Sequence, residues 1–376
     1  MAMYQVLPIV EAPFALPEIT RGSRRYNFGM FALTTENSVE WLRRHARIGD
    51  REPIHVRELA DGVSNVVLRV ETPRRTFVVK QSRPQLRTEA AWFSDINRIW
   101  RERDVMQLLR PLLPSLVVPE ILFGVEADYA FAMSHAPEPF RNWRSMLLQG
   151  EVDAALGEQA GKLLGVIHDA TARRSQEMAR FADRTVFEQL RVEPFYLKIQ
   201  QKHPHVQAPV QALIERMRSR RLALCHGDFS PKNLLVHSGG FTLVDYETGH
   251  WGDPAMDIGF FLSHILLKAV HRPEKSLDYF ALTRGFWTGY TTVQQALPIG
   301  DLRSAGIQHL AACLLARVDG TSPAPYLTGE EERETVRCIA QRLFDEKPEN
   351  WELALLAVEE SLGECRPFSL TQEEQE

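Results

Sequence analysis

The chain has 376 residues, of which 44% are hydrophobic and 25% are charged, and its formal net charge is -5 at pH 7. A length above about 250–300 residues favours two domains or lobes over a single small core. The acidic balance, with a pI near 6.2, argues against a protein that binds nucleic acid by neutralising phosphates. The four cysteines lack metal-binding spacing and predict neither a disulfide framework nor a structural metal site.

The longest apolar stretch, DIGFFLSHILLKAV, is interrupted by His264 and Lys268 and is too short to span a bilayer. The first 25 residues lack the basic and apolar regions of a signal peptide. We therefore expect a cytoplasmic protein that has neither nucleic-acid nor membrane partners.

The first third of the chain predicts an arm followed by a small sheet. Residues 1–34 contain three prolines and no periodicity, which indicates an extended arm and a candidate dimer contact. A short helix is expected within 34–48, and three strands within 54–80, where β-branched residues alternate with polar ones. A helix follows from Ser94 to before Pro111, and two further strands lie within 115–134.

Beyond residue 135 the pattern becomes mostly helical. Two strand-like runs around His226 and Asp245 are the exception. The fold class predicted is α+β, with an arm at 1–34, a small antiparallel β-rich lobe at 35–134 and a larger, mostly helical lobe at 135–376. The helices of the larger lobe are expected at 153–172, 206–220, 276–295, 301–317 and 330–346.

The stretch HGDFSPKN, at residues 226–233, supplies groups that phosphoryl transfer requires. Asp228 is placed to orient an attacking hydroxyl and accept its proton, while Asn233 and Asp245 offer oxygen ligands for Mg²⁺. The apolar run LLVHSGGFTLV between the two metal ligands predicts a hairpin that turns at 238–240. Such a hairpin would bring Asn233 and Asp245 together. His226 is interpreted as a buried hydrogen-bonding scaffold.

This stretch resembles the protein-kinase catalytic loop H-R-D-L-x-x-x-N, with Asp245 where the DFG aspartate stands. Lys80, at the end of TFVVKQ, then corresponds to the lysine that contacts the nucleotide phosphates, with Glu102 or Asp104 as its partner. The turn expected to cover the phosphates is ADGVSNVVLRV, which contains a single glycine. Its candidate nucleotide-contacting residues are Gly62, Ser64 and Asn65.

Taken together, DGVSN, VVKQ, HGDFSPKN, VDYE and GDPAMDIG resemble the aminoglycoside phosphotransferase and choline kinase superfamily, over residues 36–320. This resemblance implies a bilobal protein-kinase-like fold. Locally, VVKQSRP, INRIWRERDVMQLL and MDIGFFLSHILLKA are most similar to methylthioribose kinases. The chain departs from those kinases at Pro231-Lys232-Asn233, where it follows the wider superfamily.

The resemblance also implies roles for residues outside the motif. Asp257 would be a structural aspartate that supports the catalytic loop, whereas Asp253 is expected to cap a helix that begins near Pro254. Adenine would bind the linker around Met133, Ser134 and His135. Candidate acceptor contacts are Arg317, by the resemblance, and Glu247 and Trp251, by their position beside Asp245.

The sequence therefore predicts an ATP- and Mg²⁺-dependent kinase that phosphorylates a hydroxyl group of a sugar-like or amino-containing small molecule. Two alternatives remain open: a methylthioribose kinase proper, and a catalytically silent nucleotide-binding pseudokinase that acts as a scaffold. A protein kinase is disfavoured because no A-P-E segment follows DYE.

Overall fold

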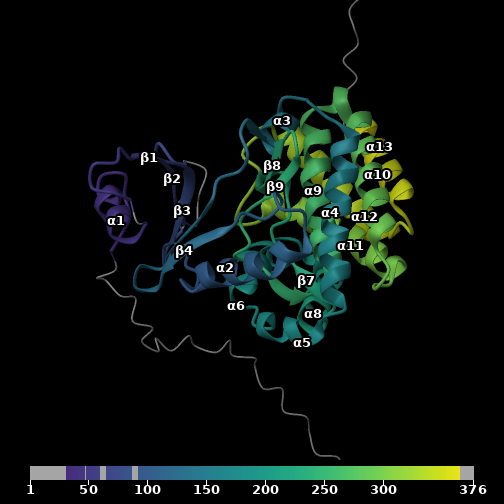
Figure 1. Cartoon of the computed structure of the whole chain (residues 1–376). Coiled ribbons are helices and arrows are strands. Elements are labelled where there is room, and N and C mark those ends of the chain that lie inside the picture. Colours follow the sequence, from purple (N-terminus) through teal and green to yellow (C-terminus); the bar gives the residue numbers. More distant parts are fainter. Residues whose placement is uncertain (1–30, 47, 60–64, 87–91, 365–376) are drawn as a thin grey trace, which may run out of the picture. The chain divides into compact units, whose positions relative to one another are not determined.

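The computed structural model describes residues 31–46, 48–59, 65–86 and 92–364 (Figure 1). The chain divides into two compact units, 1–32 and 33–376, and the second contains all the elements below. Most of the predicted arm, and the predicted phosphate contacts Gly62 and Ser64, lie outside the described residues.

A five-stranded antiparallel sheet occupies the first part of the second unit, in the order β1-β2-β3-β5-β4. Strand β3 shows why this sheet positions Lys80. Phe77 and Val79 point into an apolar cluster with helix α1, whereas Val78 and Lys80, on the opposite face, line a cavity. The predicted strands within 54–80 are thus confirmed. The elements are α1 (Ser38–His45), β1 (His55–Glu58), β2 (Asn65–Glu71), β3 (Thr76–Ser82), β4 (Ile121–Val125) and β5 (Ala130–Ser134).

Helix α2 (Arg98–Leu109) follows β3 and carries Glu102. Its N-cap is Asn97, three residues after the predicted cap Ser94, because a turn at residues 96–97 precedes the helix. The end of the helix agrees with the prediction, since Pro111 lies in a short 3-10 turn directly after it.

The remainder of the chain is mainly helical (Figure 1). Helices α4 and α10 approach each other closely through small residues: a Cβ atom on Gly161 would lie 1.9 Å from the carbonyl oxygen of Phe286. Helix α9 packs against α10 and α11. The main helices are α3 (Trp143–Leu148), α4 (Ala154–Ala172), α5 (Ser175–Met178), α6 (Thr185–Phe187), α7 (Lys198–Lys202), α8 (Gln207–Ser219), α9 (Pro254–His271), α10 (Ser276–Val293), α11 (Ile299–Asp319), α12 (Glu330–Glu346) and α13 (Trp351–Glu364).

Several parts of this helical region were not predicted, among them the short helices α3, α5, α6 and α7. The segment Glu188–Leu197 is π-helical and contains Pro194, whose missing N–H interrupts the usual hydrogen-bond ladder. Helix α13 was also missed. Its buried residues, such as Trp351, Leu355 and Val358, pack with a helical spacing that was not recognised.

Short strands hold the HGDFSPKN motif. Strand β8 (Leu234–His237) pairs with β9 (Gly240–Leu243) and with β6 (Phe140–Asn142), and β7 (Ala223–Cys225) pairs with β10 (His250–Gly252). The β8–β9 hairpin is the one predicted. Leu234 lies opposite Leu243, and the amide of Val244 donates to the carbonyl of Asn233 at 3.0 Å. Asn233 and Asp245 therefore lie together at the open end of the hairpin.

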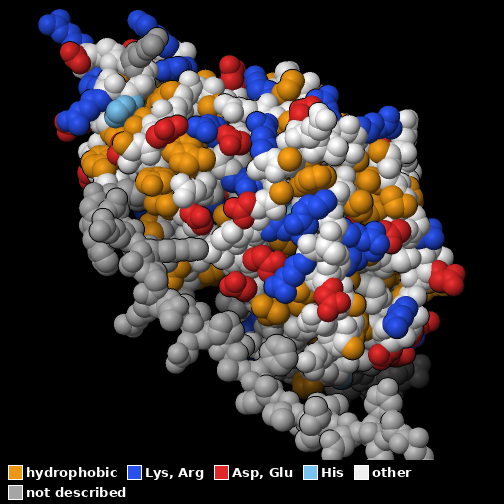
Figure 2. Space-filling model, turned by 90° about the horizontal axis from the view of Figure 1, so that it is seen from below, with side chains coloured by type: hydrophobic (Ala, Val, Ile, Leu, Met, Phe, Trp, Pro, Cys, Tyr) orange, Lys and Arg blue, Asp and Glu red, His pale blue; other side chains and the backbone are white. Residues whose placement is uncertain are grey.

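On the face shown in Figure 2, Lys and Arg side chains are interspersed with Asp and Glu. Within the described ranges, no helix is both long enough and apolar enough to cross a membrane.

The predicted cap of α9 is confirmed: the side chain of Asp253 accepts a hydrogen bond from the amide of Ala255 at the start of the helix.

Candidate active site

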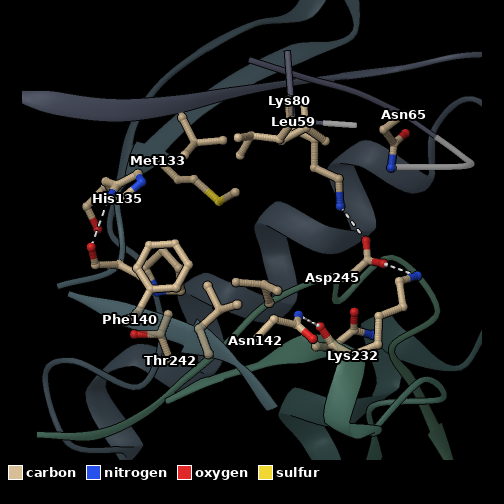
Figure 3. Close-up of a pocket in the computed structure, with 18 residues that line it drawn as sticks. Leu59, Asn65, Lys80, Met133, His135, Phe140, Asn142, Lys232, Thr242 and Asp245 are labelled. Carbon is tan, nitrogen blue, oxygen red and sulfur yellow. Dashed lines mark hydrogen bonds and ion pairs between the residues drawn. The ribbon is translucent and has the colours of Figure 1, made fainter. Parts of the chain in front are cut away.

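A cavity of about 470 Å³ lies between the sheet and the β8–β9 hairpin (Figure 3). One part of its wall is apolar, with Leu59, Val78 and Met133 from the sheet facing Leu235 from the hairpin. Its other end is polar. The remaining lining residues are Asn65, Val67, Lys80, Pro119, Ser134, His135, Ala136, Phe140, Asn142, Lys232, Asn233, Thr242, Val244 and Asp245.

Lys80 lies at the polar end and holds two carboxylates. Its Nζ is 2.6 Å from Glu102 Oε2 and 2.5 Å from Asp245 Oδ1. Asp104, the alternative partner, instead pairs with Arg103 on the surface of α2. Burial opposes the charge on Lys80, but Asp245 and Glu102 outweigh it and raise the pKa of Lys80. Lys80 therefore carries a fixed positive charge into the cavity.

Asp245 sits directly after the hairpin with a positive φ of 72°, which is uncommon for a residue with a side chain. Its carboxylate points into the cavity, between Lys80 and Lys232, whose Nζ is 3.9 Å from Oδ2 (Figure 3). Burial would raise the pKa of Asp245, but the two lysines more than offset it and lower the pKa. The carboxylate is therefore ionised and available as an oxygen ligand.

Asp228 and Asn233 are joined by hydrogen bonds. Asn233 Nδ2 donates to the carbonyl and to Oδ2 of Asp228, both at 2.9 Å. Arg191, from the π-helical segment, lies on the other side of the carboxylate, with its guanidinium 2.5 Å from Oδ1. The same guanidinium donates to the carbonyl of Gly227 at 2.7 Å. The Asp228 side chain is thus held between an amide and a cation.

Asp257 holds the backbone of the HGDFSPKN loop through hydrogen bonds. Its two oxygens accept the amides of His226 and Gly227 at 2.7 and 2.8 Å, and His168 Nε2 is 3.3 Å away. Burial would raise the pKa of Asp257, but the His168 hydrogen bond and the other contacts lower it below the usual value. His226 is buried, and its Nδ1 accepts the amide of Asp228 at 3.2 Å, as the scaffold interpretation predicts.

Other predicted contacts lie elsewhere. Glu247 is buried in an ion pair with Arg98 at 3.2 Å and accepts a hydrogen bond from Asn65 at 2.7 Å. Trp251 lies on β10 and packs against the core. Arg317, on α11, donates to the carbonyl of Ser322. The acceptor contacts assigned to Glu247, Trp251 and Arg317 stay predictions.

Two residue sets at the polar end offer metal ligands. Oxygens of Glu102, Asp245 and Glu247 lie within 4.8 Å of one another. Glu102 is paired with Lys80, however, and Glu247 with Arg98. The Nδ2 group of Asn233 contacts Asp228, which fixes the orientation of the side-chain amide. Among the described residues, no group donates a hydrogen bond to the Oδ1 atom of Asn233, so this oxygen is available as a ligand. Asp245 and Asn233 therefore fit a divalent cation best.

Sequence reasoning missed Arg98, Arg191 and His168. Arg98 is fully buried and bridges Glu247 to the carbonyl of Arg83. Arg191 and Asp228 are in contact although they lie 37 residues apart in the sequence. Arg98 lies in the stretch INRIWRERDVMQLL, but that stretch gave its side chain no role, and Arg191 and His168 stand in no motif. Only the packing of distant elements identifies the three residues.

Comparison with known proteins places the chain among phosphotransferases. A family model described as "Phosphotransferase enzyme family" matches residues 55–281. A methylthioribose kinase of Bacillus anthracis is 22% identical over 317 residues, which cover 72% of this chain and 79% of the relative.

Two solved structures have a similar fold. A choline kinase from Cryptosporidium parvum has a TM-score of 0.53 at 15% identity, covering 88% of this chain and 100% of the other. A spectinomycin phosphotransferase in complex with ADP and spectinomycin has a TM-score of 0.51 at 12% identity, covering 88% and 99%. These likenesses confirm the predicted α+β, bilobal protein-kinase-like fold.

The family match spans more than half of the chain and includes the sheet, the HGDFSPKN loop and Asp245. It confirms the predicted enzyme class, a phosphotransferase that acts on hydroxyl groups. The chain belongs to the phosphotransferase enzyme family.

Proposed function

We propose that this protein is an ATP-dependent kinase that transfers the γ-phosphate to a hydroxyl group of a small molecule. One observation carries the proposal: Lys80, Asn233 and Asp245, from three separate segments, line one end of the cavity, and Asp228 is hydrogen-bonded to Asn233 there. A carboxylate base, oxygen ligands and a phosphate-binding lysine are the groups that this reaction requires.

The shape of the cavity supports a nucleotide with its base at the apolar end. Leu59, Val78 and Met133 provide a surface for adenine, and Lys80 lies at the other end for the phosphates. The amide of Ser134 already donates to the carbonyl of Glu120 at 2.8 Å. We therefore assign the backbone contacts with adenine to His135 and Ala136, which also line the cavity.

In the transfer step, Asp228 accepts the acceptor's hydroxyl proton while the hydroxyl oxygen bonds to the γ-phosphorus. The bond between that phosphorus and the ADP oxygen breaks at the same time. Asn233 and Arg191 hold the Asp228 carboxylate in place for this contact. Asp245 and Asn233 would hold Mg²⁺, which neutralises charge on the phosphates and on the departing ADP.

Methylthioribose kinase is the second candidate, favoured by the curated relative. ADP release should therefore be measured with Mg·ATP and a panel of sugars, aminoglycosides, choline-like amines and methylthioribose. We expect turnover on one class. Asp228→Asn should lower it by on the order of 10²–10⁴ and leave Mg·ATP binding intact.

Asp50→Asn is the matched control, because Asp50 is exposed and lies in a turn before β1. Unchanged turnover in Asp228→Asn would remove Asp228 from the mechanism. ATP binding without turnover on any compound would instead favour the nucleotide-binding scaffold.

A further inference from the structure

A row of side chains runs along one face of α9, away from the nucleotide cavity. Phe260, His264 and Lys268 follow one another at intervals of four residues, so they share a face of the helix. The rings of Phe260 and His264 are 4.9 Å apart, and Lys268 Nζ donates to the carbonyl of His264 at 2.7 Å. At one end of this row, Arg191 lies 5.3 Å over the Phe260 ring while it also binds Asp228. The row therefore leads directly to the proposed catalytic base.

Four cations from four separate elements act on this row: Arg191 and Lys268 contact it directly, and the charges of Arg144 and Arg317 reach His264. The four cations are Arg144 of α3, Arg191 of the π-helical segment, Lys268 of α9 and Arg317 of α11. Burial and then the positive charges of these four residues lower the pKa of His264 well below its usual value. Tyr326 closes the other end of the row, with its ring 5.6 Å from Lys268 Nζ.

The carboxylates of the described residues do not balance this cluster. Asp228 pairs only with Arg191, and Glu332, near Tyr326, pairs with His271 at 2.9 Å. Across the described ranges, Arg144, Lys268 and Arg317 have no carboxylate within ion-pair distance.

Two further features are consistent with a cluster of cations that lacks a counter-ion in the described ranges. The Nε of Arg317 has no hydrogen-bond partner among the described residues. Burial, followed by the charges of Arg144 and Arg317, lowers the pKa of Lys268 to about 7. Like charges in a poorly solvated site repel one another, and a bound anion relieves that repulsion. Arginine guanidinium groups match carboxylate and phosphate oxygens in geometry as well as in charge.

We propose that the phosphate acceptor is an anionic hydroxy compound whose carboxylate or phosphate group binds among Arg144, Lys268 and Arg317, with its hydroxyl directed at Asp228. This inference rests on the proposed function and narrows it. It disfavours aminoglycosides and choline-like amines, because their positive charge would meet the same four cations.

Calorimetry with Mg²⁺ and a non-hydrolysable ATP analogue tests the inference without requiring turnover. Two matched series serve as probes: glycerol, glycerate, glycerol 3-phosphate and 3-amino-1,2-propanediol; and ribose, ribonate and ribose 5-phosphate. In at least one series we expect an anionic member to bind at least tenfold more tightly than its neutral and cationic counterparts. Comparing carboxylate with phosphate identifies the anionic group.

Lys268→Met and Arg144→Gln should each lower the affinity for the preferred anion at least tenfold and leave binding of the ATP analogue unchanged. Lys268→Met removes a buried charge and keeps the volume, and Arg144 is only partly buried, so both variants should fold. Binding at pH 8 should also take up a proton at Lys268, seen as a buffer-dependent enthalpy that Lys268→Met abolishes. Lys275→Met, in an exposed lysine just beyond α9, is the control.

The inference is overturned if no anion binds, if neutral or cationic members bind as tightly, or if Lys268→Met mainly weakens the ATP analogue. In that last case the cluster would bind the nucleotide phosphates instead of the acceptor. Anion binding without ADP release would leave the anion-binding site standing and refute the proposed catalytic function, so the two failures can be told apart.

Discussion

Replacing Asp257 with asparagine should destabilise the protein far more than the same replacement of an exposed aspartate. Asp257 is fully buried, and each of its oxygens accepts a backbone amide of the catalytic loop. In Asp257→Asn, one oxygen becomes an NH₂ group that faces an amide N–H. The variant loses a charge-assisted hydrogen bond, about 1.5–3 kcal/mol, and leaves a buried donor unsatisfied, about 1–3 kcal/mol. We expect a total loss of roughly 3–5 kcal/mol.

Urea denaturation at pH 7 measures this difference, and Asp169→Asn is the matched control. Asp169 also accepts two backbone amides, those of Gln295 and Ala296 at 2.7 Å, but both donate to the same oxygen, Oδ1, which an asparagine carbonyl can replace. The other oxygen loses only its ion pair with Arg173, whose side chain is largely exposed, so we expect a loss of about 1 kcal/mol or less. The native pKa of Asp257 is lowered, so its contribution is complete at neutral pH and is lost only as the pH falls through that pKa. Equal losses in the two variants would refute the reasoning.

Three further predictions follow from the packing and the charges. Gly161→Ala should lower the free energy of unfolding by more than about 2 kcal/mol, because the new Cβ would lie 1.9 Å from a carbonyl oxygen. Gly300→Ala is the control: Gly300 has open space around it, so the change should be neutral or stabilising by up to about 1 kcal/mol. Lys80→Met should lower turnover by on the order of 10²–10³ and weaken Mg·ATP binding, whereas Lys162→Met, at a half-exposed lysine of α4, should be unchanged in both assays. Burial lowers the pKa of His250 to about 4, so this residue alone should lower the free energy of unfolding by roughly 3 kcal/mol between pH 6.5 and pH 4. His250→Gln should flatten the dependence of stability on pH in this range, and an unchanged dependence would contradict the lowered pKa of His250.

The parts of the site that sequence reasoning found are those carried by short local patterns. The alternation in β3 places Lys80 on the cavity face, and the hairpin turn at 238–240 brings Asn233 to Asp245. Both depend on residues within a few positions of one another. The β-rich first part and helical second part were predictable for the same reason, since period-two and period-3.6 patterns are local.

The basic cluster lay beyond such reasoning. In the sequence, His264 and Lys268 only interrupt an apolar run. Their significance comes from the packing of α9 against α11, which brings Arg317 near, and from the π-helical segment that presents Arg191. Contacts between elements 50 or more residues apart leave no periodic signal in one chain. The proposed binding site for an anionic acceptor therefore depends on tertiary packing.

The most direct test of the central claim is phosphorus NMR of the products formed from Mg·ATP and the tightest-binding acceptor. If Asp228, Asn233, Asp245 and Lys80 catalyse transfer to a hydroxyl group, the wild-type protein should form one phosphoester per ADP, and Asp228→Asn should form almost none. ADP accompanied only by inorganic phosphate, or equal amounts of ester from both proteins, would contradict the account.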